Sequence, residues 1–443
     1  MTDHRVTPPA SPPPGPVAEP TGLARIGMLR PLKNRDFKML WAGMTVSLFG
    51  DGLYLIAIAW QSYELSDLPS AFALVSLAWS LPMVVFLLIG GVASDRFDRR
   101  NVMIASDVVR GIAVLGMGIL ALSGTIEYWH LIALAALYGI GQAFFFPAFG
   151  AIVPDIVPQD ELVQANALDN FVRPLGERLA GPAIGGLVVA AWSAGGAFVM
   201  DALTFVASAT FLSRISSRPP SKVEGKTSTL GEIREGFAFV RSQPWLWATL
   251  SAASLMILFV LGPFEVLVPW LIKYKLGGGA DDVGYVFAAS GAGGLVAALI
   301  MGQRGLPRKH VLFMYICFGG GVWLLWPYAF ITATWQGAVV EFFAWGLWGA
   351  GMVVWTTLMH RLVPRELLGR VTSLDWMVSS ALLPISFALT GPVSDWIGVE
   401  STFIWAGALG GLSIFAFLLA PGVRNSERDG SIHPLPQAET AQV

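Results

Sequence analysis

Long apolar segments alternate with short polar segments along almost the whole chain. Each apolar run has around 20 residues, which is enough for a helix to cross a hydrocarbon core about 30 Å thick. The pattern predicts twelve transmembrane helices, at about 37–63, 70–94, 101–122, 129–153, 166–190, 196–213, 244–272, 283–303, 310–331, 334–360, 371–394 and 400–421. The expected fold class is therefore an all-α membrane protein.

Composition places the chain outside the range of soluble proteins. Of its 443 residues, 54% are hydrophobic and only 13% are charged, whereas soluble domains carry about 25% charged residues. The net charge of −2 and the lack of a basic cluster argue against a nucleic-acid partner. A single cysteine, Cys317, excludes an intrachain disulfide and a multi-cysteine metal site. The expected surroundings are a lipid bilayer.

The positive charges predict an orientation. Cytoplasmic loops of membrane proteins carry the excess of Lys and Arg. Of 28 such residues, 23 fall on one side of the twelve predicted helices, and only Lys273 and Lys275 lie on the other. We therefore expect a multi-pass protein of the cell (inner) membrane with both termini in the cytoplasm. Residues 1–22, with seven prolines, and 422–443 are expected to be disordered tails.

The two halves of the chain repeat each other. The segment VPQDELVQANALD (157–169) matches VPRELLGRVTSLD (363–375), and LAGPAIGG (179–186) matches LTGPVSDW (389–396), at offsets of 206 and 210. Parallel repeats of this kind are one of the transporter architectures. The repeat predicts two pseudo-symmetric six-helix bundles joined by a linker. The expected divisions are a bundle at 23–213, a cytoplasmic linker with an amphipathic helix at 214–243, and a bundle at 244–421.

Two motifs resemble those of a known family. The stretch GVASDRFDRR (91–100) is similar to the G-x-x-x-D-R-x-G-R-R loop of the major facilitator superfamily, with Asp98 in place of the second glycine. GPAIGG (181–186) resembles the core of a motif associated with antiporters. The arginine found in helix 4 of many proton-coupled drug exporters is missing. Further stretches, NRDF (34–37), GD (50–51) and SDVVRG (106–111), resemble the branch of enterobactin exporters and macrolide efflux proteins.

This resemblance implies two bundles that rock about a central site, so that the site opens to each side in turn. The loop would then act as a cytoplasmic latch made of Gly91, Asp95, Arg96, Arg99 and Arg100. Asp95 would cap the N-terminus of helix 11, where a carboxylate meets unpaired N–H groups and the positive end of the helix dipole. Arg96 and Arg100 would pair with acids of neighbouring loops. The alternative is that the arginines only fix the topology.

A charged residue inside a predicted helix is a functional candidate, because it costs about 2.5–3.5 kcal/mol at the bilayer centre. Asp51 lies near the middle of the first helix, which lines the central cavity in the family that the motifs resemble. Desolvation favours the neutral form of a carboxyl group, so Asp51 is suited to carry a proton or to meet a cationic substrate. The alternative is a structural Asp51 that hydrogen-bonds a neighbouring helix.

Helix 166–190 carries three charged side chains. Arg173 and Glu177 are four residues apart, lie on one face and are expected to pair. The pair is either structural or part of a proton relay. Arg178 needs a partner elsewhere, on a facing helix.

Other candidates lie nearer the helix ends. Asp107 and Arg110 are three residues apart and are expected to pair near the cytoplasmic end, where they would brace the latch loop. Glu265 and Glu341 fall in the outer thirds of their helices. They either take part in proton or cation binding or line a solvated vestibule. Asp201 is expected near the outer face, in contact with water.

Glycine and proline recur in the two equivalent helices 5 and 11. The residues concerned are Gly181, Pro182, Gly185, Gly186, Gly391 and Pro392. Glycine lets helices approach closely, and proline frees a carbonyl and permits a bend. We expect these residues at the interface between the bundles.

Transport is the expected function, because no phosphate loop, HExxH or GxSxG motif is present. We expect no enzyme activity, no cofactor and no metal. The leading hypothesis is a secondary active exporter of lipophilic or amphipathic small molecules, of drug or siderophore type, that works by proton antiport. The alternatives are a facilitator or importer of a metabolite or lysolipid and a non-transporting membrane sensor.

Overall fold

A computed structural model describes residues 27–217 and 229–428. Those residues form helices and no strand. The first half of the chain contains η2 (Gly27–Lys33), α1 (Arg35–Leu65), α2 (Pro69–Arg96), α3 (Arg99–Leu122), α4 (Tyr128–Ile156), η3 (Gln159–Glu161), α5 (Leu162–Arg173), η4 (Pro174–Ala180), α6 (Gly181–Ala191) and α7 (Ala194–Ser213).

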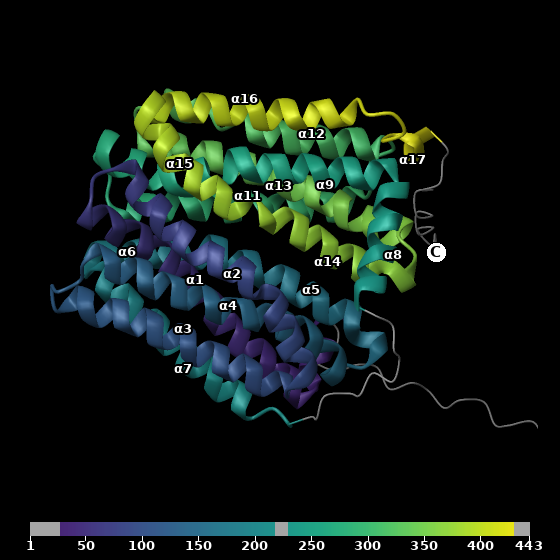
Figure 1. Cartoon of the computed structure of the whole chain (residues 1–443), viewed down its shortest axis with the longest axis horizontal. Helices are drawn as coiled ribbons and strands as arrows, with labels where there is room; N and C mark the ends of the chain where they lie inside the picture. Colours follow the sequence, from purple (N-terminus) through teal and green to yellow (C-terminus); the bar gives the residue numbers. More distant parts are fainter. Residues whose placement is uncertain (1–26, 218–228, 429–443) are drawn as a thin grey trace, which may run out of the picture.

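The second half begins with α8 (Thr229–Ser242). It continues with α9 (Pro244–Met256), η5 (Ile257–Leu261), η6 (Pro263–Leu267), α10 (Val268–Trp270), η7 (Leu271–Lys275), α11 (Ala280–Arg304), α12 (His310–Trp323), η8 (Trp326–Ala329), α13 (Thr334–Leu362), α14 (Arg365–Ala381), α15 (Leu383–Ile397), α16 (Val399–Leu418) and α17 (Asn425–Arg428). Figure 1 shows the long helices of the first half as one bundle and those of the second half as another, lying side by side.

Within the described ranges, eleven helical segments are long and apolar enough to cross a membrane. The predicted fifth span, 166–190, is the one that length and hydropathy do not mark. It lies in the helical run α5, η4 and α6, which carries four charged residues and two prolines. Proline cannot donate a backbone hydrogen bond, and the run widens to a π-helix at η4, directly after α5 ends at Arg173. Such widened turns often occur at functional sites.

Polar residues at the helix starts explain where two spans begin. The Asn34 side chain accepts hydrogen bonds from the backbone N–H groups of Asp36 and Phe37, at 2.9 and 3.3 Å, and so caps α1. Asp98 accepts from the N–H of Arg100 at 2.9 Å and caps α3. The residue that replaces the motif glycine therefore starts the helix after the loop, because an acidic N-cap satisfies a free N–H group and favours the dipole.

The two bundles meet along two helix pairs. α6 and η4 pack on α11, and α15 packs on α2. At the first contact, a Cβ added to Gly186 would lie 3.0 Å from the Cα of Gly284. At the second, a Cβ on Gly391 would lie 2.7 Å from the Cβ of Ser70. The backbones approach this closely only because glycine has no side chain.

Gly284 offers a direct test of this close packing. A Cβ at Gly284 would lie 2.6 Å from the carbonyl oxygen of Pro182, whereas one at Gly302, on the same helix, would have no heavy atom within 4 Å. Gly284→Val is therefore expected to lower the free energy of unfolding by about 1–3 kcal/mol, through overpacking. Thermal unfolding of the purified protein in detergent measures it, with Gly302→Val as the matched control. Equal midpoints for the two variants would contradict the tight interface.

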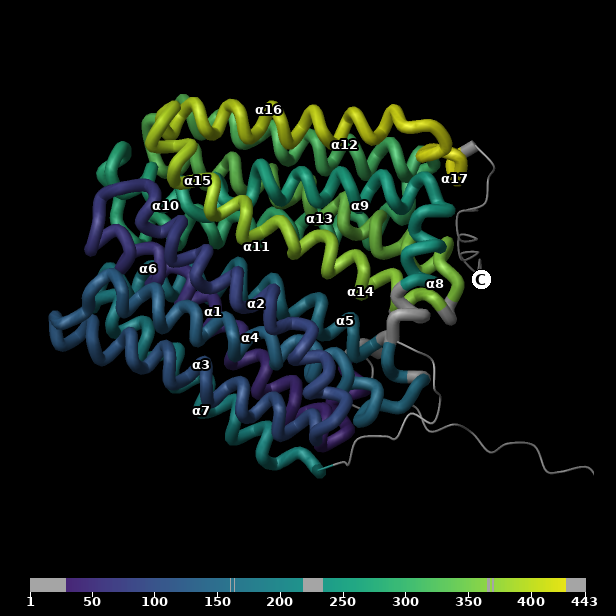
Figure 2. The backbone as a smooth tube through the Cα atoms, viewed as in Figure 1, coloured from purple at the N-terminus to yellow at the C-terminus, as the bar shows by residue number. Residues whose placement is uncertain are grey.

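Contacts between the halves differ at the two ends of the molecule. One end carries the loop 95–100 together with α8 and α17 and is called the arginine-rich end below (Figure 1). There α5 packs on η2 and η4, and α14 packs on α8 and α9, each within its own half. Figure 2 shows α8 lying across the helix ends beside α14.

Backbone-directed hydrogen bonds join the halves at the opposite end. Tyr63 donates to the carbonyl oxygen of Val266 at 2.7 Å, and Tyr274 donates to that of Tyr63 at 2.6 Å. Trp270 donates to the carbonyl of Asp67 at 2.8 Å. The bundles are therefore tied together at this end.

Candidate functional site

Asp51 lies at the centre of a polar cluster inside the first bundle. The Tyr138 hydroxyl, from α4, donates a 2.7 Å hydrogen bond to Asp51 Oδ1. The guanidinium of Arg110, from α3, is 3.7 Å from the same oxygen. The Asp51 side chain is 18% exposed, so it keeps access to water, whereas that of Arg110 is 2% exposed. The carboxyl group thus has a hydroxyl donor and a cation beside it.

Asp107 holds Arg110 in place. Arg110 Nη2 lies 2.5 Å from Asp107 Oδ1, and Ser208, on α7, donates to Asp107 Oδ2 at 2.7 Å. The guanidinium lies 4.4 Å from the ring centre of Phe145 and 4.5 Å from that of Phe205, within the range of cation–π attraction. The predicted pair of Asp107 and Arg110 therefore forms. It lies beside Asp51 and not at the latch loop, because the inner face of α3 points into the bundle.

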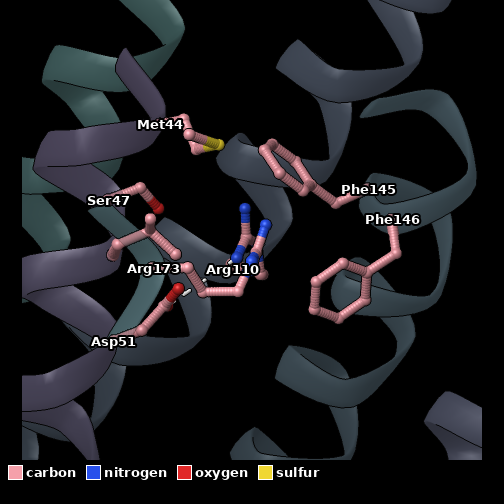
Figure 3. Close-up of a pocket in the computed structure, with 8 residues that line it drawn as sticks. Met44, Ser47, Asp51, Arg110, Phe145, Phe146 and Arg173 are labelled. Carbon is pink, nitrogen blue, oxygen red and sulfur yellow. Dashed lines mark ion pairs between the residues drawn. The ribbon is translucent and has the colours of Figure 1, made fainter. Parts of the chain in front are cut away.

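A narrow pocket opens beside this cluster. Its lining residues are Met44, Ser47, Leu48, Asp51, Arg110, Phe145, Phe146 and Arg173. Figure 3 shows Asp51 and Arg110 pointing toward one another, with the rings of Phe145 and Phe146 on the other side. The empty space is about 260 Å³, a figure that includes space open to solvent. In this conformation the enclosed part of the pocket has room for about one water molecule.

Arg173 extends the cluster to the helix after α4. It pairs with Glu177 at 3.0 Å, as the spacing predicts, and with Asp169 at 3.2 Å. Both acids are on the same helical run as Arg173. Because Arg173 also lines the pocket, it connects this run to the space next to Asp51.

The partner that Arg178 requires is Glu265. Arg178 Nη2 lies 3.3 Å from Glu265 Oε1, so the pair joins η4 of the first bundle to η6 of the second. The guanidinium also lies 4.6 Å from the ring centre of Trp345 on α13. Among the described residues, Arg178 Nη1 is buried without a hydrogen-bond partner. This ion pair crosses the interface between the bundles.

Glu341 is buried and does not line a solvated vestibule, in contrast to one of the two alternatives. It is 2% exposed, and the Tyr328 hydroxyl donates to its Oε1 at 2.7 Å. Within the described part of the chain, Oε2 has no hydrogen-bond partner. No sequence pattern indicates this burial, because Tyr328 comes from the short helix η8, whose position depends on the fold.

Asp201 is the residue that sequence reasoning undervalued. We expected it to be in contact with water, but it is 0% exposed on α7. Thr204 donates to Asp201 Oδ1 at 3.1 Å, three residues further along the same helix. Its burial results from Gly50 on α1, whose missing side chain leaves the space that the carboxyl group occupies.

The latch loop is only partly engaged. Asp95 and Arg96 are exposed and, among the described residues, have no hydrogen-bond or ion-pair partner. Arg99 pairs with Asp155 of α4. Arg100 does not pair with an acid; it donates to the carbonyl oxygen of Ile215 at 2.7 Å. The expected contact of Asp95 with helix 11 is thus not formed in this conformation, and Gly91 has no heavy atom near its Cβ position.

The glycine–proline motifs lie where two helices touch. Gly181 packs on Gly52 of α1 and Gly185 packs on Leu53, so these two glycines join helices of one bundle and not, as expected from the sequence, the two bundles. Pro182 contacts Gly52 as well, and its carbonyl oxygen faces Gly284 of the second bundle. Gly186 and Gly391 lie between the bundles. Pro392 lies inside α15, next to Gly391.

Comparison with known proteins identifies the family. A family profile described as "Transmembrane secretion effector" matches residues 26–439, nearly the whole chain. The chain belongs to this family of the major facilitator superfamily. It is 26% identical over 392 residues to macrolide efflux protein A of Streptococcus pyogenes, covering 84% of this chain and 93% of that protein.

Two further relatives of the transporter are export proteins. The multidrug efflux pump Tap of Mycolicibacterium fortuitum is 28% identical over 383 residues, with 83% of this chain and 90% of Tap covered. The enterobactin exporter EntS of Shigella boydii is 25% identical over 348 residues, with 76% and 80% covered. These relatives and the family are transporters and not enzymes.

Solved structures show the same fold. A bacterial homologue of the iron transporter ferroportin, in an inward-facing state, aligns with a TM-score of 0.66 and 17% identity, covering 90% of this transporter and 100% of that chain. At this identity the likeness concerns the fold alone. The transporter is therefore a multi-pass membrane protein with the predicted two-bundle architecture.

Proposed function

We propose that the protein is a secondary active exporter that exchanges protons for lipophilic or amphipathic small molecules. The observation that carries the proposal is Asp51, a carboxyl group in the membrane interior that reaches the pocket and has a hydroxyl donor and a cation as neighbours. A group of this kind takes up and releases a proton at modest cost, because its charged form is stabilised and its neutral form is uncharged in a low-dielectric site. The names of the relatives support export as the direction.

The arginine-rich end is assigned to the cytoplasm, because Lys and Arg gather on the cytoplasmic side. The bonds from Tyr63 and Trp270 then close the outer end. Asp95 and Arg96, which are without partners among the described residues, belong to an unlocked inner end. We assign this conformation to the inward-open state of a rocking cycle.

Arg110 allows Asp51 to change its charge without a large energetic penalty. When Asp51 is ionised, the guanidinium 3.7 Å away stabilises its charge. When Asp51 is protonated, Arg110 remains paired with Asp107 at 2.5 Å. In the cycle, Asp51 releases its proton inward as substrate enters, and takes up another from outside once the bundles have rocked.

Everted membrane vesicles with an inside-acid pH gradient test the proposal. The probes are a panel of macrolides, lipophilic cationic dyes and catechol siderophores, added one at a time while a fluorescent reporter follows the gradient. Antiport predicts that at least one compound dissipates the gradient in vesicles with the transporter and not in vesicles without it. Substrate uptake that leaves the gradient unchanged would instead indicate a facilitator.

The latch gives a separate prediction. Asp95→Asn is expected to slow transport about tenfold, because the inward-closed state loses a charge-assisted contact of about 1.5 kcal/mol at the N-terminus of helix 11. The free energy of unfolding should change by no more than about 0.5 kcal/mol, as for ordinary surface substitutions, because Asp95 is exposed in this conformation. Vesicle transport rates and thermal unfolding measure the two quantities. A transport rate equal to that of the wild type would contradict the latch and indicate that the loop only fixes the topology.

A further inference from the structure

Asp201 is a second buried carboxyl group in the first bundle. Its side chain is 0% exposed. One oxygen, Oδ1, accepts from Thr204 at 3.1 Å. The other, Oδ2, is buried and has no hydrogen-bond partner among the described residues. An ionised carboxylate in this position would have half of its acceptor capacity unsatisfied, whereas a protonated one would not carry a charge there.

Gly50 brings Asp201 next to Asp51. A Cβ added to Gly50 would lie 2.1 Å from Asp201 Oδ1 and 2.1 Å from Thr204 Oγ1, so both side chains fill the space above this glycine. Asp51 follows Gly50 in the sequence, and the two carboxyl groups are close enough to interact electrostatically. Gly50 is thus a contact point between α1 and α7, at the level of the proposed proton site.

The charges that face the cluster do not balance. The titratable side chains around Asp201 are Asp51 and Tyr54 from α1, Asp107 and Arg110 from α3, and Tyr138 from α4, while α6 contributes none. Arg110 is the one cation in this group of side chains, and Asp107 binds it most closely, at 2.5 Å. With all three carboxyl groups ionised, the site would carry two uncompensated negative charges inside the membrane.

Protons are the ligands that restore the balance. The nearest positive charge to Asp51 among the described residues is Arg110, at 3.7 Å, and it is already paired with Asp107. Arg173, which lines the same pocket, is paired with Asp169 and Glu177. Two like charges that interact in a low dielectric disfavour each other's ionised form, so protons enter such a pair in coupled steps. Asp51 lines the pocket and Asp201 does not, so protons reach Asp201 from the side of Asp51.

We propose that Asp201 is a second proton-binding carboxyl group that exchanges its proton together with Asp51. The inference rests on the proposed function, because it adds a second carboxyl group to the proton site of the proposed antiporter. In each loading step an O–H bond forms on one carboxylate oxygen as a proton leaves water, and in each release step that bond breaks and the proton returns to water. A loaded pair carries two protons where Asp51 alone would carry one.

Infrared spectroscopy of the purified full-length transporter in lipid tests this directly, with protons as the only ligand. The carbonyl stretch of protonated carboxyl groups is followed through a pH titration of the wild type, Asp201→Asn, Asp51→Asn and the control Asp375→Asn. The control removes a half-buried carboxyl group of the second bundle, which accepts from Trp355 at 3.2 Å. We expect Asp201→Asn to remove one titrating band that Asp375→Asn leaves in place.

Asp51→Asn tests whether the two carboxyl groups interact, and it leaves Asp201 unchanged. There the Asp201 band is expected to remain and its transition to move to lower pH by about one unit, because a like charge is gone. This measurement keeps the test decisive if Asp201→Asn does not fold. A band that Asp201→Asn removes but that never titrates would overturn the proposal, as would the loss of no band. A titrating Asp201 band in a protein that moves no protons in vesicles would instead contradict the proposed antiport.

Discussion

Asp51→Asn is expected to reduce substrate-dependent proton movement to the level of vesicles that lack the transporter. Asparagine has nearly the same shape as aspartate and still accepts the hydrogen bond from Tyr138, which is 2.7 Å long in the wild type. It cannot bind a proton, so the coupling step is lost while the packing is kept. Dissipation of an inside-acid gradient in everted vesicles measures the effect.

The matched control for this variant is Asp375→Asn, which removes a carboxyl group from the second bundle. It should retain gradient dissipation, and both variants should unfold at similar temperatures. If proton movement survives in Asp51→Asn, the proton site lies elsewhere. The next carboxyl groups to change would be Glu177, which pairs with Arg173 near the pocket, and Glu341, which is buried with a free oxygen among the described residues.

Arg110→Leu is expected to be the most destabilising of the substitutions discussed. It removes the guanidinium and leaves Asp107, which is 0% exposed, without its counter-ion. Breaking a buried pair on one side costs about 3–5 kcal/mol, because an uncompensated charge remains. The measurement is the free energy of unfolding in mixed micelles, with expression level in the membrane as a second readout.

Two further variants separate the charge of Arg110 from its shape. Arg110→Lys keeps the charge but loses the planar group that lies over Phe145 and Phe205, so part of the stability should return. The double variant Asp107→Leu with Arg110→Leu removes both charges and should be more stable than Arg110→Leu alone. A double variant as unstable as the single one would show that packing around the rings, and not the ion pair, dominates.

Local rules were sufficient to single out Asp51 and the near pairs. A carboxyl group in the middle of an apolar run is unusual, and spacings of three and four residues place Asp107 with Arg110 and Arg173 with Glu177 on shared helix faces. These inferences need only the geometry of one helix. The superfamily fold followed from hydropathy, the internal repeat and two motifs, and the comparisons confirm it.

Contacts between helices were beyond those rules. Whether Arg110 faces Asp51 depends on how α3 is rotated against α1, and no pattern within α3 fixes that rotation. Asp201 was misjudged for the same reason, because its burial depends on a glycine of another helix. The predicted fifth helix also contains a π-helical turn, which the sequence analysis did not predict because Pro182 was interpreted only as permitting a bend.

The bonds that join the bundles opposite the arginine-rich end share one chemical feature. Tyr63, Trp270 and Tyr274 all donate to carbonyl oxygens of the main chain. No substitution at Val266 or Asp67 removes such an oxygen, so these bonds depend on the donor side chains and not on the side chains of the acceptor residues. A change to one of the three aromatic donors is therefore the side-chain substitution that removes a bond between the bundles at this end.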